Sequence, residues 1–102
     1  MGQPDSDSVV KERVKTKKQD PTLFKVVLLN DDYTTMEFVI HVLEAIFQKS
    51  PAEAYQIMMH VHVNGRGIAG TYPWEVAETK VDAVITRARG AGYPLKAVTE
   101  EA

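Results

Sequence analysis

The first regular pattern in the chain is a run of aliphatic residues bounded by polar ones. Residues 24–30 read FKVVLLN, which is typical of a largely buried β-strand. Two shorter segments, residues 67–72 and 93–99, each follow a glycine that ends a predicted helix. We therefore expect three strands.

A turn at residues 30–33 (NDDY) leads into the first predicted helix. Thr34 is expected to be its N-cap, because Glu37 follows three residues later in the arrangement of a capping box. Apolar residues then recur at helical spacing as far as about Lys49, at Met36, Val39, Ile40, Leu43, Ile46 and Phe47.

Two further helices are predicted from similar signals. Ser50 is the expected N-cap of the second, with Pro51 at its first position, and the sequence Asn64-Gly65 is expected to end it. Pro73 is expected to open the third helix, which Gly90 and Gly92 would close. Its apolar side is formed by Ala77, Val81, Val84, Ile85 and Ala88.

The predicted order is β-α-α-β-α-β. This order favours an α+β sandwich, with a small antiparallel sheet and three helices packed on one face. Residues 23–102 would form this domain. Residues 1–22 carry many charges and little apolar surface, and we expect them to be a flexible N-terminal tail because such a segment cannot offset its ordering entropy.

Composition excludes several classes of function. The 102 residues include no cysteine, which excludes thiol chemistry and disulfide bonds. The formal net charge is −2, so no basic field favours nucleic acid, and no apolar run is long enough to span a membrane. These features fit a cytoplasmic protein without nucleic-acid or membrane partners.

Enzyme chemistry finds little support in the sequence. No serine is placed beside a base, and the sequence contains no glycine-rich phosphate loop. His60 and His62 are two residues apart, so on a helix their side chains would point about 160° apart rather than toward one metal. A metal-dependent hydrolase using His62 with Asp31 and Asp32 remains an alternative hypothesis, as does a generic interaction domain with a closed core.

Two predicted helices each present a methionine and a valine at the same spacing. Met58, Val61 and His62 share one face of the second helix. Met36 and Val39 are related in the same way on the first helix. Core packing is the simpler interpretation for any one methionine, but flexible methionine walls would also suit a pocket that accepts several side-chain shapes.

A polar cluster lies where the first strand leads into the first helix. Asn30, Asp31 and Asp32 stand there, and His62 would lie nearby if the two helices pack together. A pocket with an apolar floor and an acidic rim complements a bulky apolar group that carries a cation. The first residue of a peptide has this chemistry, because its α-ammonium group is one carbon away from its side chain.

The chain resembles the bacterial ClpS adaptors over about residues 23–100. Five blocks in the right order carry the resemblance: residues 29–34 (LNDDYT), 36–39 (MEFV), 60–62 (HVH), 76–80 (VAETK) and 93–95 (YPL). ClpS adaptors bind substrates with an N-degron, a destabilising N-terminal Leu, Phe, Tyr or Trp. They deliver these substrates to the ClpAP protease by docking on the N-terminal domain of the ClpA unfoldase. The resemblance implies no catalysis, no cofactor and no metal.

The resemblance also implies roles for individual residues. Asn30, Asp32 and His62 would hold the α-amine, with Asp31 supporting the negative rim. Met36 would be the gatekeeper that excludes β-branched first residues such as Ile and Val. Leu28 would lie behind a side-chain pocket lined by Leu29, Thr34, Met36, Val39, Met58, Val61 and Leu95.

The same resemblance assigns an unfoldase-docking surface to Tyr72, Glu75 and Lys80, and it matches residues 1–22 to the family's mobile extension. The chain departs from the family pattern at three places, one of which is the stretch 89–92 (RGAG), more flexible than usual before the last strand. Thr35 replaces a usual proline, and Pro73 stands where a capping Thr or Ser is common.

Overall fold

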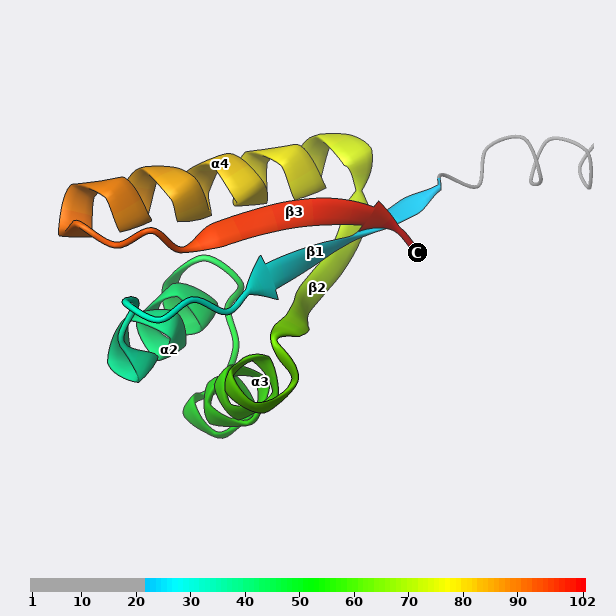
Figure 1. Ribbon diagram of the computed structural model, residues 1–102. Coiled ribbons are helices and arrows are strands. Elements are labelled where there is room, and N and C mark those ends of the chain that lie inside the picture. The colour runs from blue at the N-terminus through cyan, green and yellow to red at the C-terminus, as the bar shows by residue number, and fades with distance from the viewer. Residues whose placement is uncertain (1–21) are drawn as a thin grey trace, which may run out of the picture.

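The computed structural model describes residues 22–102, and the expected tail at residues 1–22 lies almost entirely outside this range. Three strands and three helices follow one another in the predicted order (Figure 1). Their bounds are β1 (Leu23–Leu29), α2 (Met36–Ala45), α3 (Pro51–Asn64), β2 (Arg66–Pro73), α4 (Trp74–Ala91) and β3 (Lys96–Glu101).

The three strands form one antiparallel sheet in the order β2-β1-β3. Val26 and Leu28 of β1 are completely buried and belong to the same core cluster as residues from all three helices. Val27 lies between them and points to the opposite face, outside that cluster, as expected from the alternation of side chains along a strand. The helices therefore pack on one face of the sheet, which confirms the predicted fold class.

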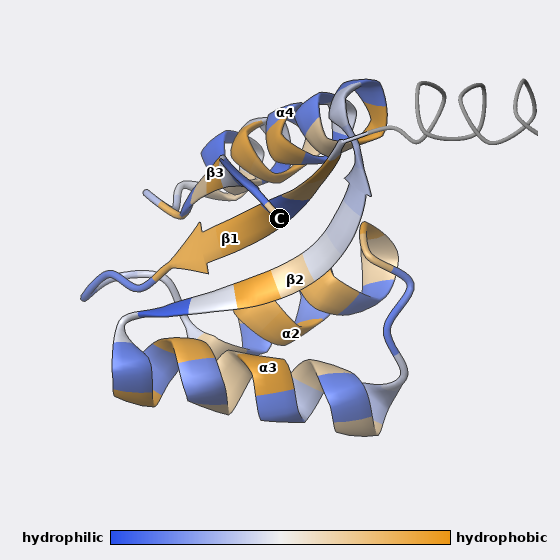
Figure 2. Ribbon diagram, turned by 90° about the vertical axis from the view of Figure 1, so that its right-hand side faces the viewer, coloured by the Kyte–Doolittle hydropathy of each residue, from blue (hydrophilic) through white to orange (hydrophobic). Residues whose placement is uncertain are grey.

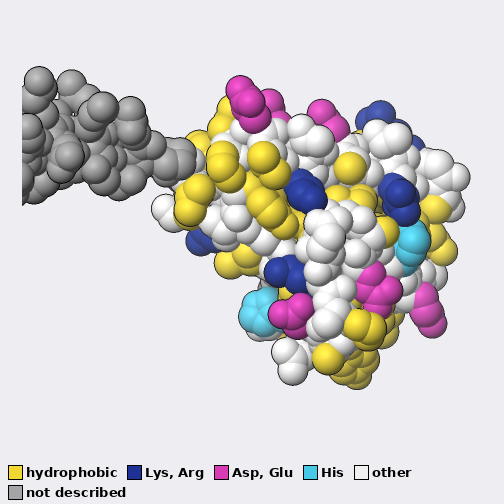
Figure 3. Space-filling model, turned by 180° about the vertical axis from the view of Figure 1, so that it is seen from behind, with side chains coloured by type: hydrophobic (Ala, Val, Ile, Leu, Met, Phe, Trp, Pro, Cys, Tyr) yellow, Lys and Arg dark blue, Asp and Glu magenta, His cyan; other side chains and the backbone are white. Residues whose placement is uncertain are grey.

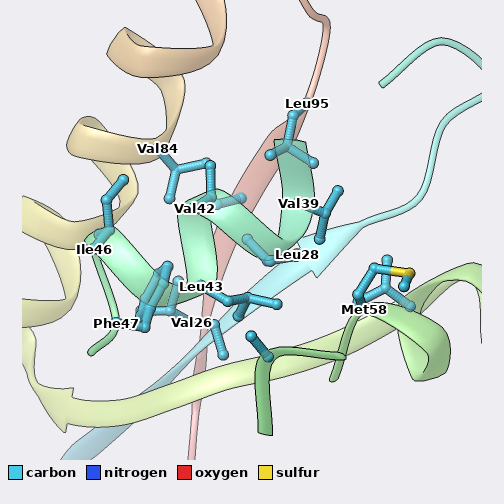
Figure 4. Close-up of a cluster of buried hydrophobic side chains, with 14 of the residues drawn as sticks. Val26, Leu28, Val39, Val42, Leu43, Ile46, Phe47, Met58, Val84 and Leu95 are labelled. Atoms are coloured by element: carbon cyan, nitrogen blue, oxygen red, sulfur yellow. The ribbon is translucent and has the colours of Figure 1, made fainter. Parts of the chain in front are cut away.

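The core lies between this face of the sheet and the helices. In Figure 2, β1 and the sides of the helices that face it carry mostly apolar residues, while the outer sides of α3 and α4 carry mostly polar ones. Figure 4 shows how α2 fills the centre of the core. The labelled side chains come from β1, all three helices and the segment before β3: Val26, Leu28, Val39, Val42, Leu43, Ile46, Phe47, Met58, Val84 and Leu95.

The start of α2 differs from its prediction by one residue. Thr35 is the N-cap, and its hydroxyl oxygen accepts a hydrogen bond from the backbone N–H of Phe38 at 3.1 Å. Thr34 does not take this role, because its hydroxyl donates to Asp31 instead. Thr35, one residue later than predicted, therefore caps the start of the helix.

The helix α2 also ends earlier than the apolar periodicity predicted, at Ala45 rather than near Lys49. Gln48 has a φ of 53°, in the left-handed region, which turns the chain out of the helix. The backbone N–H of Lys49 then donates to the carbonyl of Leu43 at 3.1 Å and closes the turn. Ile46 and Phe47 remain buried, so the periodicity correctly identified core residues beyond the helix itself.

The predicted ends of α3 are confirmed. Ser50 and Glu53 form a reciprocal capping box, Pro51 occupies the first turn, and Gly65 ends the helix in the left-handed conformation at φ 90°. The helix α4 begins after Pro73 without a side-chain cap, and Gly92 ends it at φ 84°. The last strand begins three residues later than predicted, at Lys96, and ends two residues later, at Glu101. The backbone N–H of Tyr93 still bonds back to the carbonyl of Ala88 at the end of α4, so the chain is not yet a strand there.

Among residues 22–102, no helix combines the length and hydropathy that crossing a bilayer requires.

Candidate functional site

The loop between β1 and α2 is held in shape by Asp31. Its Oδ1 atom accepts hydrogen bonds from the backbone N–H groups of Tyr33 (2.8 Å) and Thr34 (2.7 Å). Its Oδ2 atom accepts from the Thr34 hydroxyl at 2.8 Å. The Asp31 carboxylate thus turns inward to its own loop, so it shapes the rim through the loop rather than standing free beside Asp32.

These bonds also set the protonation of Asp31. Burial of the carboxylate opposes ionisation, but the hydrogen bonds from the backbone and hydroxyl of Thr34 and from the backbone of Tyr33 outweigh that effect. The pKa of Asp31 therefore lies below its ordinary value of 3.8.

We expect Asp31→Asn to be less stable than the native protein at pH 7, with a difference that shrinks in acid. A carboxylate with a lowered pKa contributes stability above its unfolded-state pKa and loses that contribution as the pH falls through its folded-state pKa. The loss should therefore begin near pH 3.8 and continue below it. Urea unfolding of the native protein and of Asp31→Asn at pH 7 and pH 3 measures the difference in their free energies of unfolding. An equal difference at the two pH values would contradict a role for the ionised carboxylate.

A backbone hydrogen bond joins the loop to the end of α3. The N–H of Asn30 donates to the carbonyl of Gly65 at 2.9 Å. Since Gly65 caps α3, this bond brings Asn30 beside the last turn of the helix, which carries His62. Asn30, Asp32 and His62 all have exposed side chains, so their polar groups are accessible at this end of the molecule.

An apolar wall lies beneath this polar rim. Val39, Met58 and Leu95 gather around Leu28 near the end of β1, at the opposite end of the core from Ile46 and Phe47 (Figure 4). They come from α2, α3 and the segment before β3, so three parts of the chain converge on one place.

The remaining predicted pocket residues differ in exposure. Val61 is 2% exposed and belongs to the same core cluster, whereas Leu29 and Thr34 are half-buried. Met36 is 41% exposed in the first turn of α2, at the surface above Val39. A methionine at this position is free to move, while the residues below it are fixed by packing.

The two other histidines have local partners. His60 Nδ1 lies 3.1 Å from the side-chain amide of Asn64, one turn further along α3. His41 Nε2 lies 2.8 Å from the guanidinium of Arg87 on α4. Within residues 22–102, no group of three His, Asp or Glu side chains is arranged to hold a metal ion.

A second surface lies between α4 and the end of α2. An open groove of about 520 Å³ brings Glu75 and Lys80 together, and Tyr72 lies beside it. Its lining consists of Ala45, Ile46, Gln48, Glu75, Val76, Thr79, Lys80 and Ala83. Figure 3 views the molecule from behind and shows hydrophobic side chains gathered near the start of the described chain, with basic side chains close to them.

Lys80 has contacts that the sequence did not reveal. Its Nζ atom donates to the carbonyl of Ile46 at 2.5 Å and to Gln48 Oε1 at 3.1 Å, and it lies 5.5 Å from the centre of the Tyr72 ring. A cation at a helix C-terminus stabilises the unpaired carbonyl groups there. Partial burial raises the pKa of Tyr72, which keeps its phenol neutral.

Comparison with known proteins gives consistent matches. The family model for the ATP-dependent Clp protease adaptor protein ClpS matches residues 19–98. The adapter proteins ClpS of Burkholderia cenocepacia (strain HI2424) and Burkholderia vietnamiensis (strain G4) are each 52% identical over 96 residues, which is 94% of this chain and 92% of theirs.

A solved structure is similar to the whole described domain. It is that of Agrobacterium tumefaciens ClpS2 bound to L-phenylalaninamide, with a TM-score of 0.78 and 40% sequence identity. The match covers 80% of this chain and 99% of the other.

Proposed function

The chain belongs to the ClpS family of ATP-dependent Clp protease adaptors, and we propose that its rim and apolar pocket bind the first residue of N-degron substrates. An adaptor binds and hands over its substrate and carries out no catalysis. The observation that carries the proposal is the ligand of the similar ClpS2 structure. Phenylalaninamide combines an α-amine with a bulky apolar side chain, which is the chemistry that this rim and pocket complement.

The proposed roles follow the chemistry of each group. Asp32 supplies the negative charge for the ammonium group, and the Asn30 and His62 side chains accept further hydrogen bonds from it. Asp31 keeps the loop in the shape that presents Asp32.

The pocket is proposed to take the side chain of an N-terminal Leu, Phe, Tyr or Trp. Its lining would be Leu29, Thr34, Met36, Val39, Met58, Val61 and Leu95. Its buried members, Val39, Met58, Val61 and Leu95, are 2–7% exposed and packed in the core, so they would form a fixed wall that loses little side-chain entropy on binding.

We also propose a partner and a location. The groove that contains Glu75 and Lys80 would dock on the N-terminal domain of the ClpA unfoldase, and Tyr72 would support it. Its exposed apolar residue Val76 beside a charged rim is typical of a protein–protein interface. Delivery to ClpAP would alter that protease's choice of substrates, and the whole process would take place in the cytoplasm.

The experiment that tests the amine site compares two fluorescently labelled peptides. One begins with a free Phe, and its twin is identical but N-acetylated. We expect saturable binding of the free peptide by fluorescence anisotropy and no measurable binding of the twin, because acetylation removes the positive charge and two hydrogen-bond donors. Equal binding of the two peptides would contradict the amine site, whatever the affinity.

A further inference from the structure

The outer edge of β3 is open. The sheet order places β3 at an edge, paired only with β1. The N–H of Ala102 donates to the carbonyl of Leu23 at 2.8 Å. Counting back from Ala102, every second residue of β3 therefore points its backbone N–H and carbonyl groups toward β1. The backbone groups of Ala97, Thr99 and Glu101 therefore point outward, and among residues 22–102 they have no hydrogen-bond partner.

A hollow of about 310 Å³ lies along this edge, beneath α4, which follows β3 closely (Figure 1). The side chain of Trp74 is 45% exposed, and its ring meets Phe24 edge-on at 5.0 Å between centres. The lining thus combines an aromatic anchor, aliphatic surface, carboxylates and strand backbone: Trp74, Glu78, Val81, Asp82, Val98 and Thr99.

The charge along the hollow is negative. Glu78 and Asp82 are four residues apart, which places both carboxylates on the same side of α4. The ion pair found within the described part of the chain, Arg66–Glu100, involves neither of them. Two adjacent carboxylates that form no ion pair with any of residues 22–102 favour a positively charged occupant.

We propose that the outer edge of β3 binds an extended segment of a partner protein in which basic and apolar side chains alternate. The segment would add a strand to the sheet through the backbone of Thr99 and its outward-pointing neighbours. Side chains on one side of the added strand would reach Glu78 and Asp82.

The hollow also explains why the proposed partner segment would carry apolar side chains between its basic ones. Trp74 and Val81 offer apolar surface beside the carboxylates, so an aliphatic side chain of the added strand would fill the space between them. Large aromatic side chains are common anchors at interfaces.

A second copy of this chain does not fit the edge. The hollow lies beside Val98 and Thr99 in the middle of β3, so antiparallel pairing of two β3 strands would bring Glu78 and Asp82 of both copies together near the centre of the interface. Like charges facing each other across paired strands are destabilising. Charge complementarity therefore favours a basic partner.

This site is separate from the proposed amine site. The amine site lies where β1 ends and β3 begins, whereas the hollow lies beside Trp74 and the middle of β3. The two could be occupied together, and the inference does not depend on the proposed function.

The test uses the full chain and the peptide acetyl-Lys-Val-Arg-Val-Lys-Leu-amide. Acetylation keeps this peptide from offering an α-amine, and Trp74 is the single tryptophan of the chain, so its emission reports on the hollow. We expect a saturable change in emission. The double variant Glu78→Lys/Asp82→Lys should weaken binding by about tenfold or more, and Glu37→Lys on α2 is the matched control that should not.

A second variant tests the strand pairing. Thr99→Pro removes one outward N–H group, and proline is tolerated on the open side of an edge strand. It should weaken binding of the peptide, while every variant should keep the circular dichroism spectrum and the thermal unfolding transition of the native chain, which shows that the fold is intact. Should Thr99→Pro disturb the fold, a probe methylated at alternate backbone nitrogens should bind more weakly to the native chain.

Several results would overturn the proposal. These are no saturable change in Trp74 emission, equal binding of a probe with glutamate in place of its basic residues, or unchanged binding of the methylated probe. Binding that appears only after residues 1–21 are removed would also overturn it, by assigning the edge to the chain's own N-terminal segment. None of these results affects the acetylation test of the amine site, so the two proposals fail independently.

Discussion

Replacing Asp32 with alanine is expected to weaken binding of a Phe-initiated peptide by about ten- to a hundredfold. A hydrogen bond to a charged group contributes about 1.5–3 kcal/mol, and every 1.4 kcal/mol is a factor of ten in affinity. Asp31 is not free to move into the position of Asp32, because both of its carboxylate oxygens accept hydrogen bonds from the loop. Fluorescence anisotropy with the labelled peptide measures the change.

Two further variants identify the cause of that loss. Asp32→Asn keeps the shape and a hydrogen-bond acceptor but removes the charge, so its affinity should lie between those of the native chain and Asp32→Ala. Glu44→Ala removes an exposed carboxylate from the far end of α2 and should leave the affinity unchanged. A less than twofold effect of Asp32→Ala would remove Asp32 from the proposed amine site.

The loop around Asp31 shows which features of the candidate site could be predicted from the sequence and which could not. The NDDYT motif and the helical spacing of Met58 and Val61 were enough to place a polar rim above an apolar wall. The resemblance gave the two aspartates different roles, but these local patterns did not show the physical reason. The difference depends on backbone N–H groups at Tyr33 and Thr34, whose directions are set only once the chain turns into α2. An aspartate followed three residues later by a threonine is a local signal for such a turn.

Other features depended on contacts between distant residues. The bond from Lys80 to the carbonyl of Ile46 joins residues 34 apart in the sequence, so no local pattern indicates it. The early end of α2 depends on the left-handed backbone of Gln48, a residue that seldom adopts this conformation. Apolar periodicity still identified Ile46 and Phe47, which are buried although they follow the last residue of the helix.

The open edge of β3 also could not be predicted from the sequence, because it depends on how the three strands are arranged in the sheet. The order of elements predicted three strands, but not which strand would be central. Since β1 takes the centre, β3 keeps one free edge, and α4 passes beside it with Glu78 and Asp82. In the sequence these carboxylates look like ordinary solvated helix charges, and only the neighbouring strand edge gives them a further role.

Replacing Met36 with alanine is expected to admit peptides that begin with Ile or Val, which the native pocket should exclude. Met36 stands at the surface above the buried Val39, so its side chain is placed to crowd a first residue that branches at Cβ. Removing it would create space at the mouth while leaving the fixed wall in place. We expect the affinity ratio of Phe- to Ile-initiated peptides to fall by about tenfold. The truncation of Met36 removes about two or three methylene-sized groups, and the burial of each such group changes the binding free energy by about 0.8 kcal/mol.

The variant Met36→Leu provides the matched control, because leucine has a similar volume and should keep the exclusion of Ile and Val. Met36 is 41% exposed, so its truncation should cost little stability, and thermal unfolding of the variants checks this. If Met36→Ala and the native chain showed the same selectivity, the gate would have to be formed by fixed residues of the wall. Val39 would then be the first to examine, because it lies directly below Met36 on the same face of α2.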